Sequence, residues 1–467
     1  MSDQPSPLGT EGQPLRVAIV GSGPSGFYAA GQLLSQKDLT VEVDLFERLP
    51  TPWGLVRGGV APDHPKIKSV SRVYEKTAKK PGFRFFGNVE VGRDVFADEL
   101  RDWYHAVLYS VGTAGDRKSG IPGEDLPGSH SATEFVGWYN GHPDYADHEF
   151  DLSGERAIVI GNGNVAVDVA RMLTLSHDEL AATDTADHAI EAFDAAGVRE
   201  IVILGRRGPQ QAAFTNPELL ELGELTDADV IVDPGDLQIE AEFHDDGLEG
   251  TAKRNMEILH EYAQREPSGK HKKVVLRFLT SPVEILPGDD GKVGAVKVVR
   301  NRLTRDDSGA LRATPTDVTE TLEAGIVFRA IGYTGVAVPG VPFDERRGLI
   351  PNEDGRVVGA ERTYVAGWIK RGPSGVIGTN KKCATDTVTQ LLADREAGVF
   401  DGTPVRDADE IAATARERQP ELVDYTGWEA IDAAEKGAGE PTGRPRVKLT
   451  RFEQLLDAAG VRSGSAG

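Results

Sequence analysis

The stretch LRVAIVGSGPSG, residues 15–26, decides the fold of this chain. Its apolar first half, 15–20, predicts a short buried strand, and the glycine-rich turn follows at once. The stretch 27–34, rich in Ala and Leu, then predicts a helix, and the apolar run 41–47 predicts a second strand. A strand, a glycine-rich turn, a helix and another strand form a βαβ unit, so the sequence predicts an α/β fold.

Each glycine of the first motif has a physical task in a dinucleotide site. Gly21 permits a tight turn, Gly23 lets the backbone approach a pyrophosphate, and Gly26 lets the helix pack closely on the strand. Glu47 ends the second strand, where an acid binds ribose hydroxyls and repels a 2′-phosphate. We therefore predict an FAD or NAD site here; the alternative is a purely structural glycine turn.

The same order of elements recurs later in the chain. It consists of a strand at 156–160, the motif Gly161-x-Gly163-x-x-Ala166, a helix at 165–173 and a strand at 200–204. Two dinucleotide folds in one chain predict two nucleotide cofactors.

The second fold ends its second strand on Arg206 and Arg207, where the first fold ends on Glu47. Guanidinium groups form bidentate, charge-assisted hydrogen bonds to phosphate, each worth roughly 1.5–3 kcal/mol. One such bond favours NADP over NAD by about ten- to over a hundredfold. We therefore predict FAD in the first fold and NADP(H) in the second. The alternative is that both arginines lie in a solvated turn.

Composition narrows the function further. The chain has 467 residues, enough for about two or three domains. Its net charge of −22 argues against nucleic acid or an anionic membrane as the main partner. No apolar run approaches the roughly 18–20 residues of a membrane span, and we expect a cytoplasmic protein. Cys383 is the only cysteine, which excludes disulfide-reductase chemistry of the CxxC type and a self-contained iron–sulfur cluster.

The rest of the chain gives weaker patterns. We expect an exposed helical insertion at 176–198, a polar loop or hairpin at 302–319, and a linker at 437–445. Further helices are expected at 251–265 and 452–458, and further strands at 274–279, 292–299 and 321–328. We find no constellation of nucleophilic residues or of metal ligands, so no metal is expected.

Six longer stretches carry a family resemblance that is far more specific than glycine spacing. These stretches are GSGPSG at 21–26, PTPWGLVRGGVAPDHPKIK at 50–68, RFFGNVEVG at 84–92, GNGNVAVDVAR at 161–171, GRRGPQQAAFT at 205–215 and GWIKRGPSGVIGTNK at 367–381. They lie within 15–391, and through them the chain resembles a ferredoxin–NADP⁺ reductase of the adrenodoxin reductase type. The resemblance is to the bacterial, actinobacterial-like members.

The resemblance implies two Rossmann-like dinucleotide-binding domains of the glutathione-reductase type, with the NADP domain inserted into a discontinuous FAD domain. The implied parts are the FAD domain at 15–115 and 332–467, with a C-terminal extension, and the NADP domain at 116–331. The segment 1–14, which has no Arg or Lys and no apolar block, is expected to be a disordered tail.

Positions that match the family pattern are implied to bind the two cofactors. The FAD set is Gly21, Gly23, Pro24, Ser25, Gly26, Glu47, Leu55, Val91, Trp368, Gly375, Val376 and Ile377. The NADP(H) set is Arg117, Asn162, Gly163, Asn164, Val165, Arg206, Arg207, Glu218 and, again, Gly375. One departure from the pattern is Gly58, where members of the family often carry a larger residue.

The implied reaction is a hydride transfer from NADPH to FAD followed by single-electron transfer to ferredoxin. By resemblance His64 and Glu221 approach each other near the nicotinamide, where they orient it or act in proton transfer. The alternative for His64 is a loop histidine that hydrogen-bonds backbone only. Trp53 either covers the flavin or packs its own loop.

Ferredoxins are typically acidic, so docking on this acidic chain requires a local basic face. One candidate face repeats every four residues along a helix: Lys68, Arg72, Lys76 and Lys80, extended by Lys66, Lys79 and Arg84. The other contains Lys253 and Arg254, the region to which the family resemblance assigns docking. The alternative for either face is a merely solvated surface.

Three rival functions remain open from the sequence. The first is an NADPH-dependent flavin monooxygenase or oxidase, and the second is an NADPH-binding sensor. The third is an electron-input subunit like the small subunit of glutamate synthase, although the N-terminal cysteines of that family are absent here. The sequence does not identify the ferredoxin, the downstream acceptor or the direction of electron flow.

Overall fold

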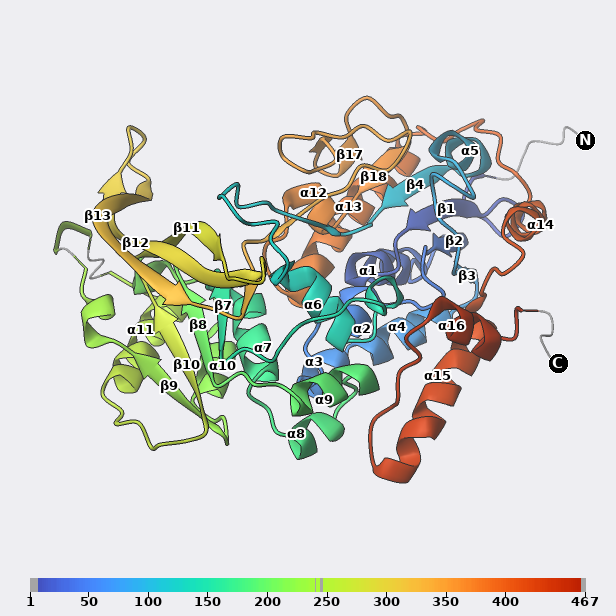
Figure 1. Cartoon of the computed structure of the whole chain (residues 1–467). Coiled ribbons are helices and arrows are strands. Elements are labelled where there is room, and N and C mark those ends of the chain that lie inside the picture. The colour runs from blue at the N-terminus through green and yellow to red at the C-terminus, as the bar shows by residue number, and fades with distance from the viewer. Residues whose placement is uncertain (1–6, 240, 244–246, 463–467) are drawn as a thin grey trace, which may run out of the picture. The chain divides into compact units, whose positions relative to one another are not determined.

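A computed structural model describes residues 7–239, 241–243 and 247–462 (Figure 1). The chain forms two compact units. Unit 1 consists of residues 1–60, 64–115 and 332–467, and unit 2 consists of residues 61–63 and 116–331. Each unit contains a mainly or wholly parallel sheet with helices against it, and unit 2 is inserted into the sequence of unit 1. The predicted α/β class with two Rossmann-like folds is confirmed.

Unit 1 is built on a seven-stranded sheet in the order β16-β17-β18-β4-β1-β2-β3. The parallel strands are β1 (Leu15–Val20), β2 (Val41–Phe46), β3 (Phe83–Phe86), β4 (Ala106–Tyr109) and β18 (Thr363–Val365). The short antiparallel strands are β16 (Asn352–Glu353) and β17 (Arg356–Val357). Alternate side chains of β1 enter two different cores, because successive residues of a strand point to opposite faces of the sheet.

The helices of unit 1 cover both faces of this sheet. The face that receives Val17 and Ile19 packs against α1 (Pro24–Leu33), α4 (Ser71–Ala78), α13 (Ile377–Glu396), α15 (Tyr425–Gly439) and α16 (Phe452–Ala458). The face that receives Ala18 and Val20 packs against α5 (Ala97–Trp103) and α14 (Ala408–Arg418). Short helices α2 (Leu55–Gly58), α3 (Pro65–Lys68) and α12 (Trp368–Arg371) lie in the connections, with the 3₁₀ turn η5 at Glu440–Thr442.

Unit 2 has a six-stranded parallel sheet in the order β6-β14-β7-β8-β10-β9. These strands are β6 (Ser129–Ser131), β7 (Arg156–Ile160), β8 (Glu200–Leu204), β9 (Ala228–Val232), β10 (Lys272–Arg277) and β14 (Ile326–Arg329). One face packs against α6 (Ala132–Tyr139), α7 (Asn164–Met172), α8 (His177–Ala181), α9 (Asp187–Asp194), α10 (Asn216–Leu222) and α11 (Gly250–Ala263). The 3₁₀ turns are η1 (Pro143–Tyr145), η2 (Pro209–Gln211), η3 (Pro234–Leu237) and η4 (Ala241–Phe243).

A second, antiparallel sheet covers the other face of the unit 2 sheet. Its strands are β11 (Thr280–Pro287), β12 (Val293–Arg305) and β13 (Leu311–Glu323). The stretch 302–319, for which the sequence left a loop or a hairpin open, belongs to the long β12–β13 hairpin (Figure 1). The prediction of a single strand at 321–328 is wrong, because β13 ends at Glu323 and the parallel strand β14 begins at Ile326. The polar composition of β13 follows from its exposure along most of its length.

Two other expectations about the connections are also corrected. The insertion at 176–198 is helical as predicted but not simply exposed, since Leu180, Ile190 and Phe193 are buried in the core of unit 2. The expected linker at 437–445 begins inside α15, which continues to Gly439 before η5. Glycine-rich composition predicts a linker here, but it does not reveal that α15 has a buried side. Among the described residues, no helix has the length and apolar character needed to cross a membrane.

The segment expected to be a loose tail, 1–14, is fixed over the part that the structure describes. The backbone N–H of Thr40 donates to the carbonyl of Gly9 at 2.8 Å, and Arg395 donates to the carbonyl of Leu8. Residues 1–6 lie outside the described residues. A two-stranded sheet of β5 (Gly115–Asp116) and β15 (Tyr333–Thr334) marks the places where the chain passes between the units.

Arg84 has a structural role inside unit 1 and does not extend the basic face that the sequence suggested. Its guanidinium binds both carboxylate oxygens of Asp44, at 2.6 and 2.5 Å, and donates to the carbonyl of Ala408 at 2.7 Å. The hydroxyl of Tyr104 donates to the same carboxylate at 2.5 Å. Only 3% of the Asp44 side chain is exposed, so its charge depends on these partners.

We predict that Arg84→Met lowers the free energy of unfolding by about 3–5 kcal/mol, because it leaves a buried carboxylate without its cation. Urea unfolding followed by circular dichroism measures the loss. Lys79→Met is the matched control, since Lys79 is 64% exposed and its ion pair with Glu429 is long, at 3.4 Å. A loss in Arg84→Met no larger than that of the control would show that Asp44 does not need this partner.

Candidate functional site

The carboxyl ends of the parallel strands in unit 1 bring the predicted FAD residues to one edge of the sheet. Parallel pairing places the end of β1 beside the ends of β2 and β4, and β18 ends beside β4. The chain runs from β1 to β2 on one side, whereas β4 and β18 lie on the other. Ligands of open α/β sheets bind at such a switch point, outside the carboxyl ends of the strands.

The backbone at the first glycine motif requires glycine at two positions and leaves room at the third. A side-chain carbon at Gly21 would lie 2.6 Å from the carbonyl oxygen of Ser110, and Gly21 has a φ of +100°. A side-chain carbon at Gly26 would lie 2.1 Å from the carbonyl oxygen of Gly21. At Gly23 the same carbon would meet nothing within 4 Å. The backbone at Gly23 therefore faces space that a phosphate group fits, at the N-terminus of α1.

Glu47 is fixed against this glycine loop. Its Oε2 accepts hydrogen bonds from the backbone N–H of Ser22 at 3.0 Å and from the Ser22 hydroxyl at 2.6 Å. Its Oε1 accepts from the backbone N–H of Leu49 at 3.0 Å. A carboxylate oxygen accepts more than one hydrogen bond, so these contacts orient Glu47 without using up its capacity for ribose hydroxyls. Sequence reasoning missed Ser22, because the glycine pattern treats that position as variable.

Several of the FAD candidates in unit 1 are apolar or aromatic. Leu55 is 38% exposed, and Val376, which caps α13, is 57% exposed. The indole nitrogen of Trp368 is buried and has no hydrogen-bond partner among the described residues. Exposed apolar side chains and an unsatisfied indole donor both suit a planar heterocycle such as a flavin, so the residues present fit FAD.

The remaining FAD candidates lie on the same unit. Pro24 and Ser25 begin α1, and Ser25 is buried. Val91 forms an isolated bridge with Val95, and Gly375 has a φ of +78° just before α13. Ile377 is the first residue of α13.

Unit 2 repeats the arrangement at the carboxyl ends of β7, β8 and β14. A side-chain carbon at Gly161 would lie 2.2 Å from the carbonyl oxygen of Ala330, whereas one at Gly163 would only touch Ala213 at 4.0 Å. Gly163 caps α7, which begins at Asn164, so Asn164 and Val165 form its first turn. The backbone at Gly163 is therefore placed like that at Gly23, with room for a pyrophosphate.

Arg206 and Arg207 follow β8 and are available for an anion. Arg206 is exposed and Arg207 is half-buried, and neither guanidinium has an ion pair with any residue that the structure describes. The turn itself is rigidly held: the side-chain amide of Asn301 donates to the carbonyl of Arg206 at 2.8 Å, and the N–H of Leu279 donates to the carbonyl of Arg207 at 3.0 Å. Two cations on a fixed turn fit a 2′-phosphate.

Asn301 is a residue that sequence reasoning missed. It is 3% exposed and lies on β12, where a register irregularity interrupts the pairing with β13. Its amide also donates to the Ser281 hydroxyl at 2.8 Å. No local pattern points to Asn301, because its partner Arg206 is 95 positions away in the sequence.

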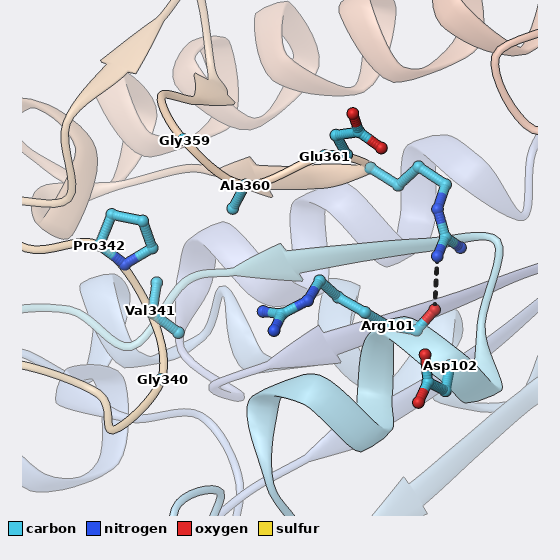
Figure 2. Close-up of a pocket in the computed structure, with 9 residues that line it drawn as sticks. Arg101, Asp102, Gly340, Val341, Pro342, Gly359, Ala360 and Glu361 are labelled. Carbon is cyan, nitrogen blue, oxygen red and sulfur yellow. Dashed lines mark hydrogen bonds between the residues drawn. The ribbon is translucent and has the colours of Figure 1, made fainter.

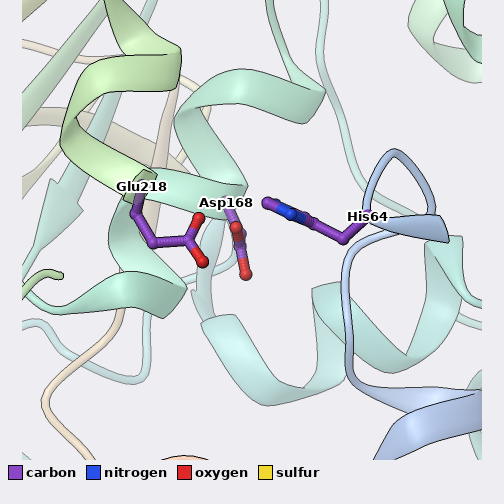
Figure 3. A group of neighbouring side chains, drawn as sticks. All are labelled: His64, Asp168 and Glu218. Carbon is purple, nitrogen blue, oxygen red and sulfur yellow. The ribbon is translucent and has the colours of Figure 1, made fainter. Parts of the chain in front are cut away.

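A buried arginine on α7 gathers the acidic residues that the sequence singled out. Arg171 is 3% exposed and donates to Glu218 at 3.1 Å, to Glu221 at 2.7 Å and to Asp63 at 3.1 Å. Burial alone would lower the pKa of Arg171, but the charge of Asp63 and of the other acids raises it above its ordinary value. Figure 3 shows Asp168 and Glu218, which come from the adjacent helices α7 and α10 of unit 2. Glu218 and Glu221 are thus held in fixed positions by one cation.

The other two sequence candidates have simple local settings. His64, also drawn in Figure 3, is the residue that precedes α3 in unit 1, whereas Glu221 belongs to unit 2. The approach of His64 to Glu221 therefore stays a prediction. Arg117 is exposed at the start of unit 2.

The two basic faces differ in structure. On α3 and α4 the side chains of Lys66, Arg72 and Lys76 are exposed beside two exposed apolar residues, Ile67 and Val73. On α11, Lys253 and Arg254 are exposed, but Arg254 forms an ion pair with Glu257 at 2.9 Å. Lys66, Arg72 and Lys76 thus combine positive charge with exposed apolar surface, which is typical of a protein-docking surface.

A cavity of about 450 Å³ lies at the opposite edge of the unit 1 sheet (Figure 2). Its lining includes Arg101 and Asp102, which precede β4, and Arg362, which precedes β18 and donates to the carbonyl of Arg101 at 2.8 Å. The amino ends of these strands border it, so this cavity is separate from the glycine motif. Acidic and basic side chains both line it, and it has no feature that selects a cofactor.

Comparison with known proteins agrees with this geometry. Residues 15–202 match the family model of the pyridine nucleotide-disulphide oxidoreductases. The chain is 52% identical over 452 residues to the NADPH-ferredoxin reductase FprA of Mycobacterium tuberculosis, covering 95% of this chain and 99% of that one. It is 41% identical over 455 residues to the mitochondrial NADPH:adrenodoxin oxidoreductase of Salvelinus fontinalis, covering 95% and 91% of the two chains.

A solved structure is similar over nearly the whole chain. The structure of Mycobacterium tuberculosis FprA in complex with NADPH has 51% sequence identity and a TM-score of 0.91. The match covers 96% of this chain and 100% of that chain.

We predict that Gly23→Ala folds normally but binds FAD at least about tenfold more weakly. The added carbon meets no protein atom within 4 Å, and the φ of −73° at this position suits alanine. A methyl group there would occupy the space that the pyrophosphate approaches. Titration of the full-length apoprotein with FAD, together with thermal unfolding, measures both effects. Gly26→Ala is the contrasting variant, because its methyl group collides with the backbone of Gly21 and prevents folding.

Proposed function

We propose that this chain, which belongs to the NADPH-ferredoxin reductase family of the adrenodoxin reductase type, passes electrons from NADPH through FAD to a ferredoxin. The single observation that carries the proposal is the contrast between the two glycine-motif sites. In unit 1 the oriented carboxylate of Glu47 follows the end of β2, whereas in unit 2 Arg206 and Arg207 follow the end of β8. Two nucleotide sites with opposite charge at the ribose end suit two different cofactors.

In this proposal, FAD binds to residues 15–115 and 332–467, and NADP(H) binds to residues 116–331. When bound, FAD supplies the conversion of a two-electron hydride donor into single electrons. The chain itself positions the groups: the N-terminus of α1 binds the pyrophosphate of FAD, and Glu47 binds its ribose. Leu55, Trp368 and Val376 cover the flavin ring.

The proposed NADP(H) site also places a helix N-terminus at the pyrophosphate, but it carries positive charge, not negative charge, at the ribose end. The N-terminus of α7 receives the pyrophosphate, and the arginine turn receives the 2′-phosphate. Arg171 keeps Glu218 and Glu221 in place, since one buried cation fixes both carboxylates. We propose that Glu221, with His64, orients the nicotinamide. Arg117 and Gly375 are proposed to contact the same cofactor.

We propose that ferredoxin docks on the basic face of α3 and α4, and that the face with Lys253 and Arg254 is the second candidate. The chain carries a net charge of −22, so an acidic partner is attracted only where cations gather locally. Lys66, Arg72 and Lys76 supply exposed charge around Ile67 and Val73. The single helix predicted through Lys68 and Lys80 is wrong, because Lys68 ends α3 and Lys80 lies beyond the end of α4. Both lysines still border this face, although Lys80 donates to the Ser35 hydroxyl at 2.5 Å. We propose the reducing cytoplasm as the place of action, in keeping with a single cysteine.

We predict that replacing both Arg206 and Arg207 by alanine lowers the preference for NADPH over NADH by about ten- to over a hundredfold. The reason is the loss of charge-assisted bonds to the 2′-phosphate, which NADH does not have. Stopped-flow bleaching of the flavin at about 450 nm, with each nucleotide in turn, measures the preference. Arg265→Ala is the control, since Arg265 is exposed on the same unit and pairs with Glu261.

The same measurement tests the function as a whole. Wild-type flavin reduced by NADPH should be reoxidised by ferredoxin in the absence of oxygen. Equal rates with NADH and NADPH in the wild type would contradict the role of the arginine turn. Reoxidation by oxygen alone would favour a flavin monooxygenase or oxidase.

We predict that Arg72→Glu with Lys76→Glu raises the KM for ferredoxin at least about tenfold at low salt and removes most of its salt dependence. Two reversed charges cancel most of the local positive charge, and so remove the attraction that salt screens within roughly 10 Å. Steady-state reduction of ferredoxin at several salt concentrations measures this effect. Lys253→Glu with Arg254→Glu tests the second face in the same assay. Unchanged KM and salt dependence in both variants would show that neither face docks ferredoxin.

A further inference from the structure

The C-terminal part of unit 1 binds the loop that follows β2 through one fully buried carboxylate. Glu435 on α15 has no exposed side-chain surface. Its two oxygens accept from the two terminal nitrogens of Arg57, at 2.8 and 2.5 Å, in a bidentate pair. Arg57 lies on α2, which is 378 positions earlier in the sequence. This pair therefore connects the end of the chain to the loop at 53–58.

Two further hydrogen bonds satisfy the buried carboxylate. Arg446 donates to its Oε2 at 3.0 Å, and the backbone N–H of Leu449 donates to its Oε1 at 2.9 Å. Lys448 donates to the carbonyl of Arg57 at 3.2 Å, so the segment after α15 also holds the backbone of that arginine. Burial alone would raise the pKa of Glu435, but Arg57 and then Arg446 hold it below its ordinary value. A charge this deeply buried keeps its place only with such partners.

The loop that receives these contacts has a strained backbone. Trp53 has a φ of +87° and Gly54 a φ of +51°, and a bulky residue rarely adopts such a value. Strain of this kind persists only where the surroundings over-determine it. Here the N–H of Trp53 donates to the carbonyl of Ser22 at 3.0 Å, inside the glycine motif. A side-chain carbon at Gly54 would lie 3.0 Å from the Cα of Gly23.

An aromatic contact joins the same two segments. The ring of Trp53 packs edge-on against Trp428 of α15, with ring centroids 4.8 Å apart, and Arg57 lies over the Trp428 ring at 5.4 Å. Trp53 is 4% exposed, so it packs within the protein. Of the two alternatives that the sequence left for Trp53, these contacts support packing of the loop. α15 thus contacts the strained loop in two ways, through the ion pair of Glu435 with Arg57 and through the packing of Trp428 against Trp53.

We propose that Glu435 is a positioning residue of the FAD site: through Arg57 it holds the loop at 53–58 against the glycine motif before the cofactor binds. The consequence is a preorganised site that loses little conformational freedom on binding, which strengthens affinity. This proposal depends on the assignment of FAD to unit 1. It gives the C-terminal extension, which the sequence left unexplained, a part in retaining the cofactor.

The test is the rate at which the full-length holoenzyme releases FAD. Glu435→Gln keeps the shape of the side chain but removes its charge and places an amide donor against the donors of Arg57. We expect FAD release at 25 °C to be at least about tenfold faster, as followed by flavin fluorescence after dilution. We also expect the melting temperature to rise less with added FAD, because stabilisation by a ligand falls as its dissociation constant rises.

Two further variants serve as a control and as an intermediate case for this experiment. Glu429→Gln is the matched control on the same helix; Glu429 is exposed and should leave FAD release unchanged. Arg57→Lys keeps the positive charge but loses the bidentate geometry, so we expect a release rate between wild type and Glu435→Gln. It also serves as the milder variant in case Glu435→Gln does not fold.

A merely structural role of Glu435 gives a different result. The melting temperature would then fall, but FAD release from the folded protein and the FAD dependence of melting would stay as in wild type, which would overturn the proposal. A wild-type chain that retains no FAD would instead contradict the proposed function. If Gly23→Ala weakens FAD binding and both Glu435→Gln and Arg57→Lys leave it unchanged, only the positioning role is wrong.

Discussion

The close approach of backbone to backbone at the end of β1 is the constraint on which unit 1 depends. Gly26 allows α1 to begin so near Gly21 that no side chain fits between them. This approach aims the N-terminus of α1 at the edge where β1, β2 and β18 end. The contact of Trp53 with Ser22 and the orientation of Glu47 both depend on the position of this loop. In unit 2, the approach of Gly161 to the carbonyl of Ala330 has the same role.

Buried charges connect parts of the chain that are far apart in the sequence. Asp44 is held by Arg84, Glu435 by Arg57 and Arg446, and a single arginine, Arg171, holds several acids. Each arrangement satisfies its buried group by hydrogen bonds as well as by charge, which is the condition under which such groups are tolerated. The removal of one partner is therefore costly, although an isolated surface pair contributes little.

Local sequence patterns predicted much of the fold. Apolar strands followed by glycine turns and helices mark both dinucleotide folds, because their periodicity and turn chemistry act over only a few residues. The helix after the first motif begins at Pro24, three residues before the predicted start, since proline is favoured in the first turn of a helix. The long β12–β13 hairpin was harder to predict, because exposed strands with polar side chains lack the apolar alternation.

The sequence by itself determined the two glycine-motif loops, the acid at the end of one and the arginines at the end of the other. These features lie within about fifty residues of one another in each fold, so spacing reveals them. Only the tertiary structure decided which charges are structural: Arg84 binds Asp44, and Arg57 binds Glu435. It also decided that Asn301 supports the arginine turn and that α15 packs on the loop at 53–58. The physical reason is that such contacts join residues far apart in the chain, and no local periodicity records which of many possible partners a folded backbone brings together.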